Sequence, residues 1–171
     1  MKTQSAAIKI FQKSKSLHKK GDYDGYLFFL KKASKKGYHQ AQLELGLRYM
    51  NGKFPEREPA LAFDWLSKSA RQGNDAALYN LGIAYQLGEG TDKNSEKAAL
   101  CYQKAAQKGH IKGQYNLAVC YAEGVGVEQS DKKSFEWMLL AAKQGLPEAQ
   151  YYVGQAFLLG DGINHSVSDA F

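Results

Sequence analysis

The sequence predicts an all-α protein, a solenoid of stacked helical hairpins with a period of 36 residues. The first observation behind this prediction is a ladder of equally spaced glycines, Gly37, Gly73, Gly109 and Gly145. The second is that similar phrases follow these glycines in one register: AQLELGLRYMNG, ALYNLGIAYQLG, GQYNLAVCYAEG and AQYYVGQAFLLG. Agreement between four consecutive units at this many positions is typical of a repeat protein.

The first half of each unit predicts one helix. In the second unit Ala77, Leu81, Gly82 and Tyr85 recur at helical spacing and define an inward face. The segment Gly88–Gly90 then ends the helix, because glycine readily adopts the positive φ that a helix C-terminus requires.

The second half of each unit predicts a second helix. It begins after one of three polar residues, Glu58, Asn94 or Ser130. Pro59 lies just inside the start of its copy, where the missing N–H costs nothing. In the next copy apolar and small residues continue from Ala98 to Ala106, and Gly109 ends the helix. Such a hairpin cannot bury its apolar stripe alone, so neighbouring hairpins must stack.

The combined pattern resembles a known repeat. It reads A-x-x-x-L-G-x-x-Y-x-x-G-x-G, then K-A-x-x-W/C-Y-x-K-A-A-x-x-G, and is carried by Ala77, Leu81, Gly82, Tyr85, Gly88, Gly90, Lys97, Ala98, Tyr102, Lys104, Ala105, Ala106 and Gly109. This pattern is similar to the Sel-one-like repeat, a relative of the tetratricopeptide repeat. The resemblance implies a right-handed superhelix with units at residues 37–72, 73–108, 109–144 and 145–171, the last one incomplete. It also implies an adaptor, since bacterial members serve in signalling, cell-envelope assembly or host-cell contact.

The two ends of the chain depart from the pattern. Residues 1–36 match it loosely and predict a basic capping hairpin, with a first helix over residues 5–20 and a short turn at Gly21–Asp24. At the other end, Phe171 falls where a further second helix would begin. We therefore expect the helix that contains Tyr151 and Phe157 to lack its usual cover. Either the chain is a segment of a longer array, or another chain covers that face, for example by end-to-end self-association.

The net charge of +6 is a local feature of the N-terminus. Residues 1–37 hold ten lysines against Asp22 and Asp24, a balance of +8, and the remaining residues balance at −2. A basic end can contact nucleic acid, an anionic membrane or an acidic protein, and the plain alternative is a solvated helical face. Arginine is absent from this segment and few aromatic residues interleave KSKSLHKK, which weighs against specific nucleic-acid recognition. Contact with a membrane surface stays open.

Residues of catalytic and metal-binding type show no useful spacing. The histidines fall at different repeat positions, mostly near turns: His18, His39, His110 and His165. Cys101 and Cys120 have neither zinc nor redox spacing, so we expect two buried thiols, and a disulfide between adjacent helices stays open. The segments GEGTDK and GVGVEQ close helices and follow no strand, which excludes a nucleotide loop. We expect no enzymatic activity, no cofactor, no metal and no small-molecule substrate.

The N-terminal segment gives no targeting signal. MKTQSAAIKIFQKSKSLHKK carries a lysine or polar residue every few positions and lacks the apolar core of a signal peptide. No stretch reaches the length of a membrane span. We expect a cytoplasmic protein, with export by a route that needs no signal left open.

The surface of the first helices is the candidate site. In solenoids of this kind these helices line the concave side. Removing the inward face leaves the candidates Leu43, Glu44, Leu47, Tyr79, Asn80, Ile83, Gln86, Tyr115, Asn116, Val119, Glu123, Tyr151, Tyr152 and Gln155. Tyrosine suits interfaces because it combines a large apolar area with one polar tip, and an asparagine carboxamide both donates and accepts hydrogen bonds. The resemblance implies that Asn80 and Asn116 pair with the backbone of an extended peptide. Alternatively, Tyr79 and Tyr115 simply pack between units.

These observations predict a non-enzymatic scaffold that binds a peptide or partner protein in the concave groove. One alternative is an inhibitor or immunity-type module that caps another protein through its convex or end surfaces. The other is a contact between the basic N-terminus and nucleic acid or an anionic membrane.

Overall fold

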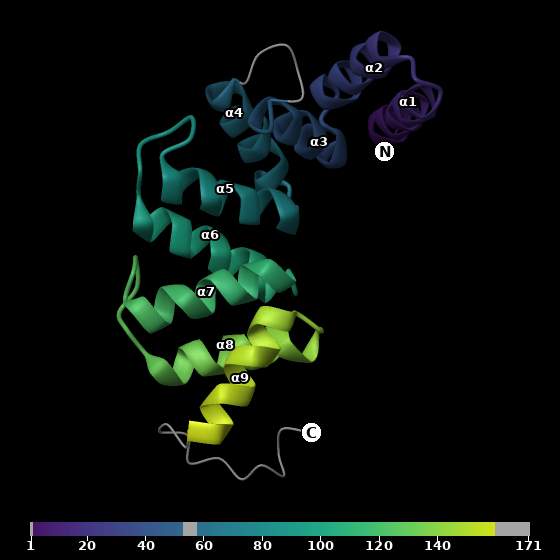
Figure 1. Cartoon of the computed structure of the whole chain (residues 1–171). Helices are drawn as coiled ribbons and strands as arrows, with labels where there is room; N and C mark the ends of the chain where they lie inside the picture. The colour runs from purple at the N-terminus through teal and green to yellow at the C-terminus, as the bar shows by residue number, and fades with distance from the viewer. Residues whose placement is uncertain (1, 53–57, 160–171) are drawn as a thin grey trace.

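The protein is a single file of helices. The computed structural model describes residues 2–52 and 58–159 (Figure 1). Over this part of the chain nine α-helices follow one another without a strand: α1 (Lys2–Lys19), α2 (Tyr23–Lys35), α3 (His39–Met50), α4 (Pro59–Arg71), α5 (Asp75–Leu87), α6 (Ser95–Gln107), α7 (Ile111–Glu123), α8 (Asp131–Lys143) and α9 (Pro147–Leu159). The predicted all-α repeat solenoid is confirmed.

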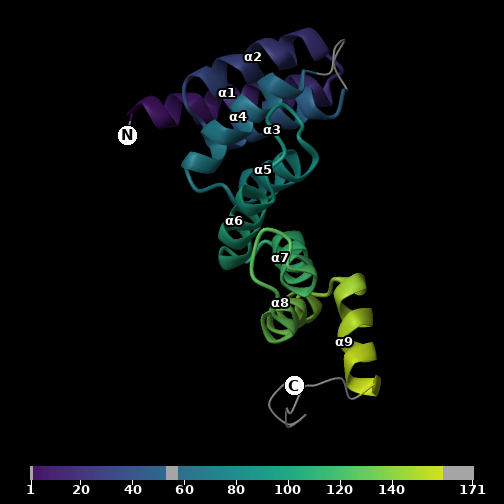
Figure 2. The same ribbon diagram turned by 90° about the vertical axis from the view of Figure 1, so that its left-hand side faces the viewer.

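Successive helices pack on one another, so the chain forms a stack of hairpins with α1 and α9 at its opposite ends (Figure 1). Figure 2 shows the first helix α5 to the right of the second helices α4 and α6, and α9 to the right of α8. The predicted N-terminal hairpin is present as α1 and α2, although its first helix starts at Lys2, earlier than expected. The incomplete last unit extends past the described residues. Phe171 and His165 lie outside them.

Polar caps set the start of most helices. The Asn74 side chain accepts a hydrogen bond from the Ala77 N–H at 2.9 Å, and the Asn94 side chain accepts one from the Lys97 N–H at 2.8 Å. Ser130 does the same for α8 through the N–H of Lys133. These side chains satisfy N–H groups that have no partner inside the helix. Two of the predicted second-helix starts, Asn94 and Ser130, are therefore confirmed as caps.

In the two Gly-x-Gly segments that the structure describes, the glycines have separate tasks, which differs from the prediction that both end the helix. Gly88 caps α5 in the left-handed conformation at φ 76°. Gly90 instead lies against the start of α4, where an added Cβ would come within 2.1 Å of the Pro59 carbonyl oxygen. A Cβ added to Gly126 would likewise come within 2.1 Å of the Ser95 carbonyl oxygen at the start of α6. The second glycine therefore permits contact between neighbouring hairpins.

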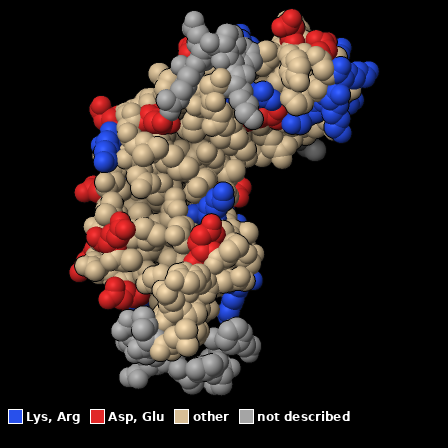
Figure 3. Space-filling view, in the orientation of Figure 1, with Lys and Arg blue, Asp and Glu red and all other residues tan. Residues whose placement is uncertain are grey.

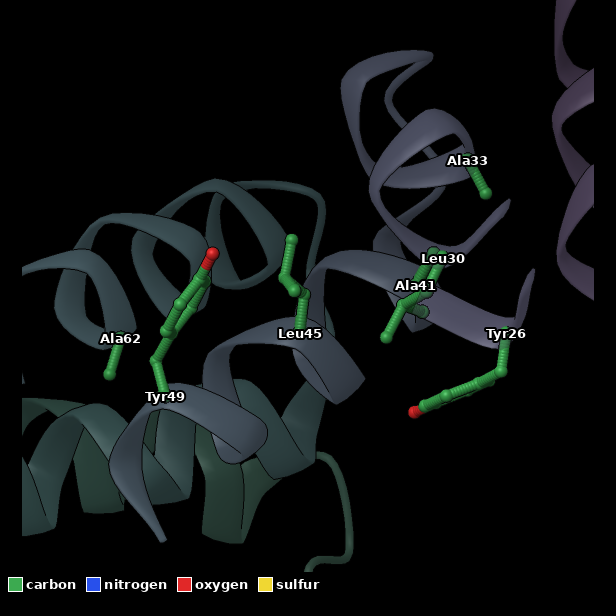
Figure 4. Close-up of a cluster of buried hydrophobic side chains, with 7 residues drawn as sticks. All are labelled: Tyr26, Leu30, Ala33, Ala41, Leu45, Tyr49 and Ala62. Carbon is green, nitrogen blue, oxygen red and sulfur yellow. The ribbon is translucent and has the colours of Figure 1, made fainter. Parts of the chain in front are cut away.

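The core is continuous from hairpin to hairpin. Figure 4 shows one part of it, in which α2, α3 and α4 contribute the buried side chains Tyr26, Leu30, Ala33, Ala41, Leu45, Tyr49 and Ala62. Small residues let the helices approach closely: an added Cβ at Gly46 would come within 2.8 Å of the Leu66 side chain. The first helices α3, α5 and α7 are thus each held between two second helices, which fixes the register of their outward side chains.

Buried glutamines link successive second helices in two of the three full repeats. Gln42 donates to the Ser34 carbonyl of α2 at 3.1 Å and accepts from Gln72 at the end of α4 at 2.8 Å. Two hairpins later Gln114 donates to the Ala106 carbonyl of α6 and accepts from Gln144 at the end of α8 at 2.7 Å. These bridges join the ends of neighbouring second helices through a side chain of the first helix between them.

Candidate functional site

The column of Leu43, Tyr79, Tyr115 and Tyr151 is divided between packing and exposure. Tyr79 is half-buried, stacks on the His110 ring at 4.7 Å between centroids and tilts against Tyr102 at 6.0 Å. Burial raises the pKa of Tyr79. Tyr115 and Leu43 are also half-buried and pack against core clusters. These three side chains therefore hold hairpins together and present only an edge to the surface.

Tyr151, the last member of this column, is different. It is 69% exposed on α9, and its hydroxyl accepts a hydrogen bond from Gln155 Nε2 at 2.6 Å. Tyr152 is exposed beside it, and Gly154 has open space where Gly46 and Gly82 meet a neighbouring side chain. Within the described part of the chain, the prediction that this helix lacks its usual cover holds for these residues. Val153 and Phe157 are exceptions: Val153 is buried against the preceding hairpin, and the half-buried Phe157 ring lies 5.8 Å from that of Phe135 between centroids.

In the neighbouring column Glu44 is committed to the N-terminal hairpin. Its carboxylate accepts a hydrogen bond from the Tyr26 hydroxyl at 2.6 Å and pairs with Lys15 Nζ at 3.0 Å. Arg48 Nε donates to the same hydroxyl at 3.1 Å. Burial is the main cause that raises the pKa of Tyr26, and Glu44 adds to it. Glu44 thus joins α1, α2 and α3 and is not a free acidic contact.

The asparagines of this column differ from one another. The Asn116 side chain lies beside the hydroxyl of Tyr102, and that hydroxyl donates to Gln86 Oε1 at 2.6 Å. Asn80 Nδ2 donates to the Ala76 carbonyl within its own helix at 2.7 Å. The Asn80 carboxamide oxygen makes no hydrogen bond to any described residue. The Asn116 carboxamide oxygen makes none either, so both asparagines have an acceptor available to a partner.

An apolar column accompanies the asparagines. Leu47, Ile83 and Val119 are half-buried at equivalent positions of α3, α5 and α7. Gln86 and Glu123 are exposed beside this column, and the exposed Gln155 of α9 is its fourth member. Figure 3 shows that the face over α5 and α7 carries few charged side chains. The arrangement therefore offers uncharged, partly apolar strips with polar groups beside them.

Sequence reasoning missed the partners of these side chains. Tyr26 and Tyr102 reach the first-helix surface from different positions of α2 and α6. They do not share one position of the repeat, so the alignment of the repeats did not indicate their common role. One signal in the sequence was available. Gln86 is polar, whereas its counterparts Met50 and Ala122 are apolar, which indicates a polar partner near Gln86.

The basic N-terminal hairpin also carries more aromatic surface than the segment KSKSLHKK indicated. Figure 3 shows lysines gathered over α1 and α2. Lys13 Nζ lies 4.2 Å from the centroid of the Phe29 ring, and Phe28 is 62% exposed. The fold thus brings α2 aromatics beside α1 lysines.

Reactive groups are dispersed over the described residues. Among them no cluster of three or more His, Cys, Asp or Glu side chains could hold a metal ion, and Cys101 and Cys120 are free thiols. His110 caps α7 by accepting from the Gly113 N–H at 3.0 Å, and burial lowers its pKa. None of the helices in these ranges has the length and apolar character to cross a membrane.

The repeat itself identifies the family. The sequence matches the Sel1 repeat in four successive segments, residues 39–74, 75–110, 111–146 and 147–171. The chain belongs to the Sel1 repeat family. Proteins with Sel1 repeats generally mediate protein–protein interaction, and their fold is a typical interaction scaffold.

Solved structures support this assignment. A Sel1 repeat protein from Oxalobacter formigenes is 33% identical, with 75% of this chain and 97% of that chain covered at a TM-score of 0.69. The protective antigen c5321 of uropathogenic Escherichia coli, which has the same kind of repeat fold, is 40% identical over 82% of this chain at a TM-score of 0.76. The match covers 30% of that longer protein. Helicobacter pylori cysteine rich protein B is 25% identical, with 72% of this chain and 93% of that chain covered at a TM-score of 0.59. No curated protein matches the sequence.

Proposed function

We propose that this Sel1 repeat protein is a non-enzymatic adaptor whose first helices α3, α5 and α7 bind an extended segment of a partner protein. The observation that carries the proposal is the alignment of Leu47, Ile83 and Val119 beside Asn80 on successive first helices. The distance between equivalent positions is set by the stacking of hairpins, so the pattern repeats along one side of the molecule.

The chemistry of this side supports an extended peptide as the occupant. Half-buried aliphatic side chains receive apolar side chains of a partner at modest desolvation cost. The free carboxamide oxygen of Asn80 accepts from a backbone N–H, and the amide group of Gln86 remains available to donate. The low charge of the face over α5 and α7 favours a segment of mixed polar and apolar composition (Figure 3).

The hydrogen bonds beneath the surface hold it in one shape. The Tyr102 hydroxyl holds Gln86 of α5 by a hydrogen bond and lies beside Asn116 of α7, so one buried side chain contacts two neighbouring first helices. A preorganised surface loses less conformational entropy on binding. The buried tyrosine is a positioning residue for the proposed site.

The test compares two variants by quantitative capture of partners on the immobilised full chain. Asn80→Ala with Gln86→Ala removes polar groups from the first-helix side. The control, Glu136→Ala with Leu140→Ala, changes exposed residues of the second helix α8. We expect the first variant to lose specific partners at unchanged circular dichroism and the control to retain them. The reverse pattern contradicts the proposal and favours a module that binds through its second helices.

A further inference from the structure

A cleft lies on the opposite side of the solenoid from the proposed groove, between the second helices α4 and α6. Its volume is about 530 Å³. The floor is formed by Leu78 and Leu81 of α5, both buried, and Leu100 of α6 lines it while 48% exposed. Arg71, Lys104 and Lys108 also line the cleft. An apolar floor and three cations therefore share one recess.

The cleft occurs where the glutamine bridge of the repeat is missing. Leu78 stands at the position of Gln42 and Gln114, and Lys108 stands at the position of Gln72 and Gln144. The leucine side chain has no N–H group to donate to a carbonyl at the end of the preceding second helix. The lysine ammonium finds no side-chain acceptor on leucine, so the hydrogen bond between two carboxamides cannot form. The second helices α4 and α6 are consequently not joined at this point, unlike α2 with α4 and α6 with α8.

The missing bridge leaves a backbone acceptor in the cleft. The carbonyls of Ser34 and Ala106 each accept a second hydrogen bond from a glutamine side chain. The equivalent residue Ala70 lines the cleft, and its carbonyl accepts from the N–H groups of Gln72 and Gly73 but from no side chain among the described residues. The donor that a glutamine supplies to the other two carbonyls is therefore missing here, and an N–H group from outside the chain can take its place.

The cations of the cleft have no acidic partner in the described part of the chain. The one ion pair there joins Lys15 to Glu44, far from this site. The Lys108 ammonium lies over Gly73, where an added Cβ would come within 3.3 Å of Nζ. Charge-assisted hydrogen bonds to carboxylates are the natural use of such donors.

From this combination we infer a second binding site, a cleft that receives an acidic peptide segment of a partner protein. An apolar side chain of the segment packs on Leu78 and Leu81, and a backbone N–H donates to the Ala70 carbonyl. Neighbouring carboxylates accept from Arg71, Lys104 and Lys108. The site is independent of the first-helix groove and persists if that groove has no ligand.

The probe is a synthetic peptide, acetyl-Glu-Glu-Leu-Phe-Glu-Glu-amide, titrated calorimetrically into the full chain. We expect saturable binding with one peptide per chain, weakened by salt because exposed charges are screened. A peptide with glutamine in place of every glutamate should bind at least about tenfold more weakly. Equal binding of both peptides, or no saturation by the acidic one, overturns the inference.

Two variants separate the cleft from general charge. Leu78→Gln with Lys108→Gln restores the pair found in the sister hairpins, so the fold should be retained while the cleft closes. The control, Lys132→Gln with Lys143→Gln, removes two exposed cations of α8 outside the cleft. We expect the first to lose peptide affinity at least about tenfold and the second to change it little. If L78Q/K108Q unfolds, Arg71→Gln with Lys104→Gln gives the same readout with the floor intact. Equal affinity in the cleft and control variants contradicts the site.

Cys101 gives a direct report of location, because its thiol lines the cleft. In a Cys120→Ala background, saturating peptide should slow alkylation of Cys101 several-fold, and Asn80→Ala should leave this protection unchanged. Absence of protection places the peptide elsewhere and overturns the inference. If wild type, but not L78Q/K108Q, self-associates in light scattering, the occupant is a second copy and the inference also fails.

Discussion

The ring of Tyr102 on α6 fills the space above Gly82 on α5. A Cβ added to Gly82 would come within 2.3 Å of the Tyr102 Cε1 atom. The ring is buried, and its hydroxyl continues past the glycine to Gln86. One helix-to-helix contact therefore sets both the spacing of the hairpin and the position of a candidate binding residue.

Gly82→Ala should destabilise the protein even though alanine favours helix. Alanine gains about 1 kcal/mol over glycine in helix propensity. Overpacking against the buried Tyr102 ring typically costs about 1–3 kcal/mol, and loss of the hydrogen bond between Tyr102 and Gln86 would add to that cost. The matched control is Gly154→Ala, at the same repeat position with open space around it. Urea unfolding should show a loss for G82A and a neutral or small stabilising effect for G154A. Equal effects would disprove the assigned contact.

Gly90→Ala should be more damaging than Gly109→Ala. Both glycines have positive φ, 73° and 86°, so each substitution pays a backbone cost of about 1–2 kcal/mol. Only Gly90 also meets the Pro59 carbonyl of the neighbouring hairpin, whereas Gly109 has nothing within 4 Å. The difference between their free energies of unfolding measures the contact between hairpins. A difference near zero rejects the separate role of the second glycine.

Tyr102→Phe should cost about 0.5–1.5 kcal/mol, because the ring stays in place while one buried hydroxyl and its hydrogen bonds are lost. Tyr121→Phe is the control, since the hydroxyl of half-buried Tyr121 makes no hydrogen bond to any described residue. A double-mutant cycle of Tyr102→Phe with Asn116→Ala should show coupling. Additive effects would mean that Asn116 is not held by Tyr102.

Stability should fall at alkaline pH through Cys120. Burial raises the pKa of this thiol to about 11 from its ordinary value of 9.0, and Glu123 adds to the shift. The unfolded thiol ionises first, so its contribution is intact below about pH 9 and is lost as pH rises to about 11. One proton gives a slope of at most about 1.4 kcal/mol per pH unit. Urea unfolding of wild type and Cys120→Ala in reductant at pH 8 and 10.5 isolates this group. Identical slopes for the two proteins refute the assignment.

The hairpins were predictable because four copies of one phrase report the same structure. Asn94, Ser130 and Gly88 occupy caps whose chemistry is local, so their roles follow from residue type and position. The candidate site was harder to predict. Glu44 and Asn116 have the right position on the first helices, but Tyr26 and Tyr102 contact them from neighbouring helices. Such contacts depend on side-chain reach across the stack.

The glutamine bridges show the opposite case, a signal present in the sequence and not used. Gln42, Leu78 and Gln114 stand in one column, and Gln72, Lys108 and Gln144 stand in another. The paired change from glutamine to leucine and lysine in one hairpin marks the cleft. Only the structure showed that the two columns touch.

The measurement that tests the central claim most directly is photo-crosslinking from defined positions in the full chain. Benzoylphenylalanine is introduced at Gln86 or Glu123, exposed on first helices, and for comparison at Glu136 or Leu140, exposed on a second helix. We predict protein adducts from positions 86 and 123 that Asn80→Ala reduces, and none of these adducts from positions 136 and 140. Adducts that form only from the second helix, or equally from both sides, would contradict a partner-binding groove on the first helices.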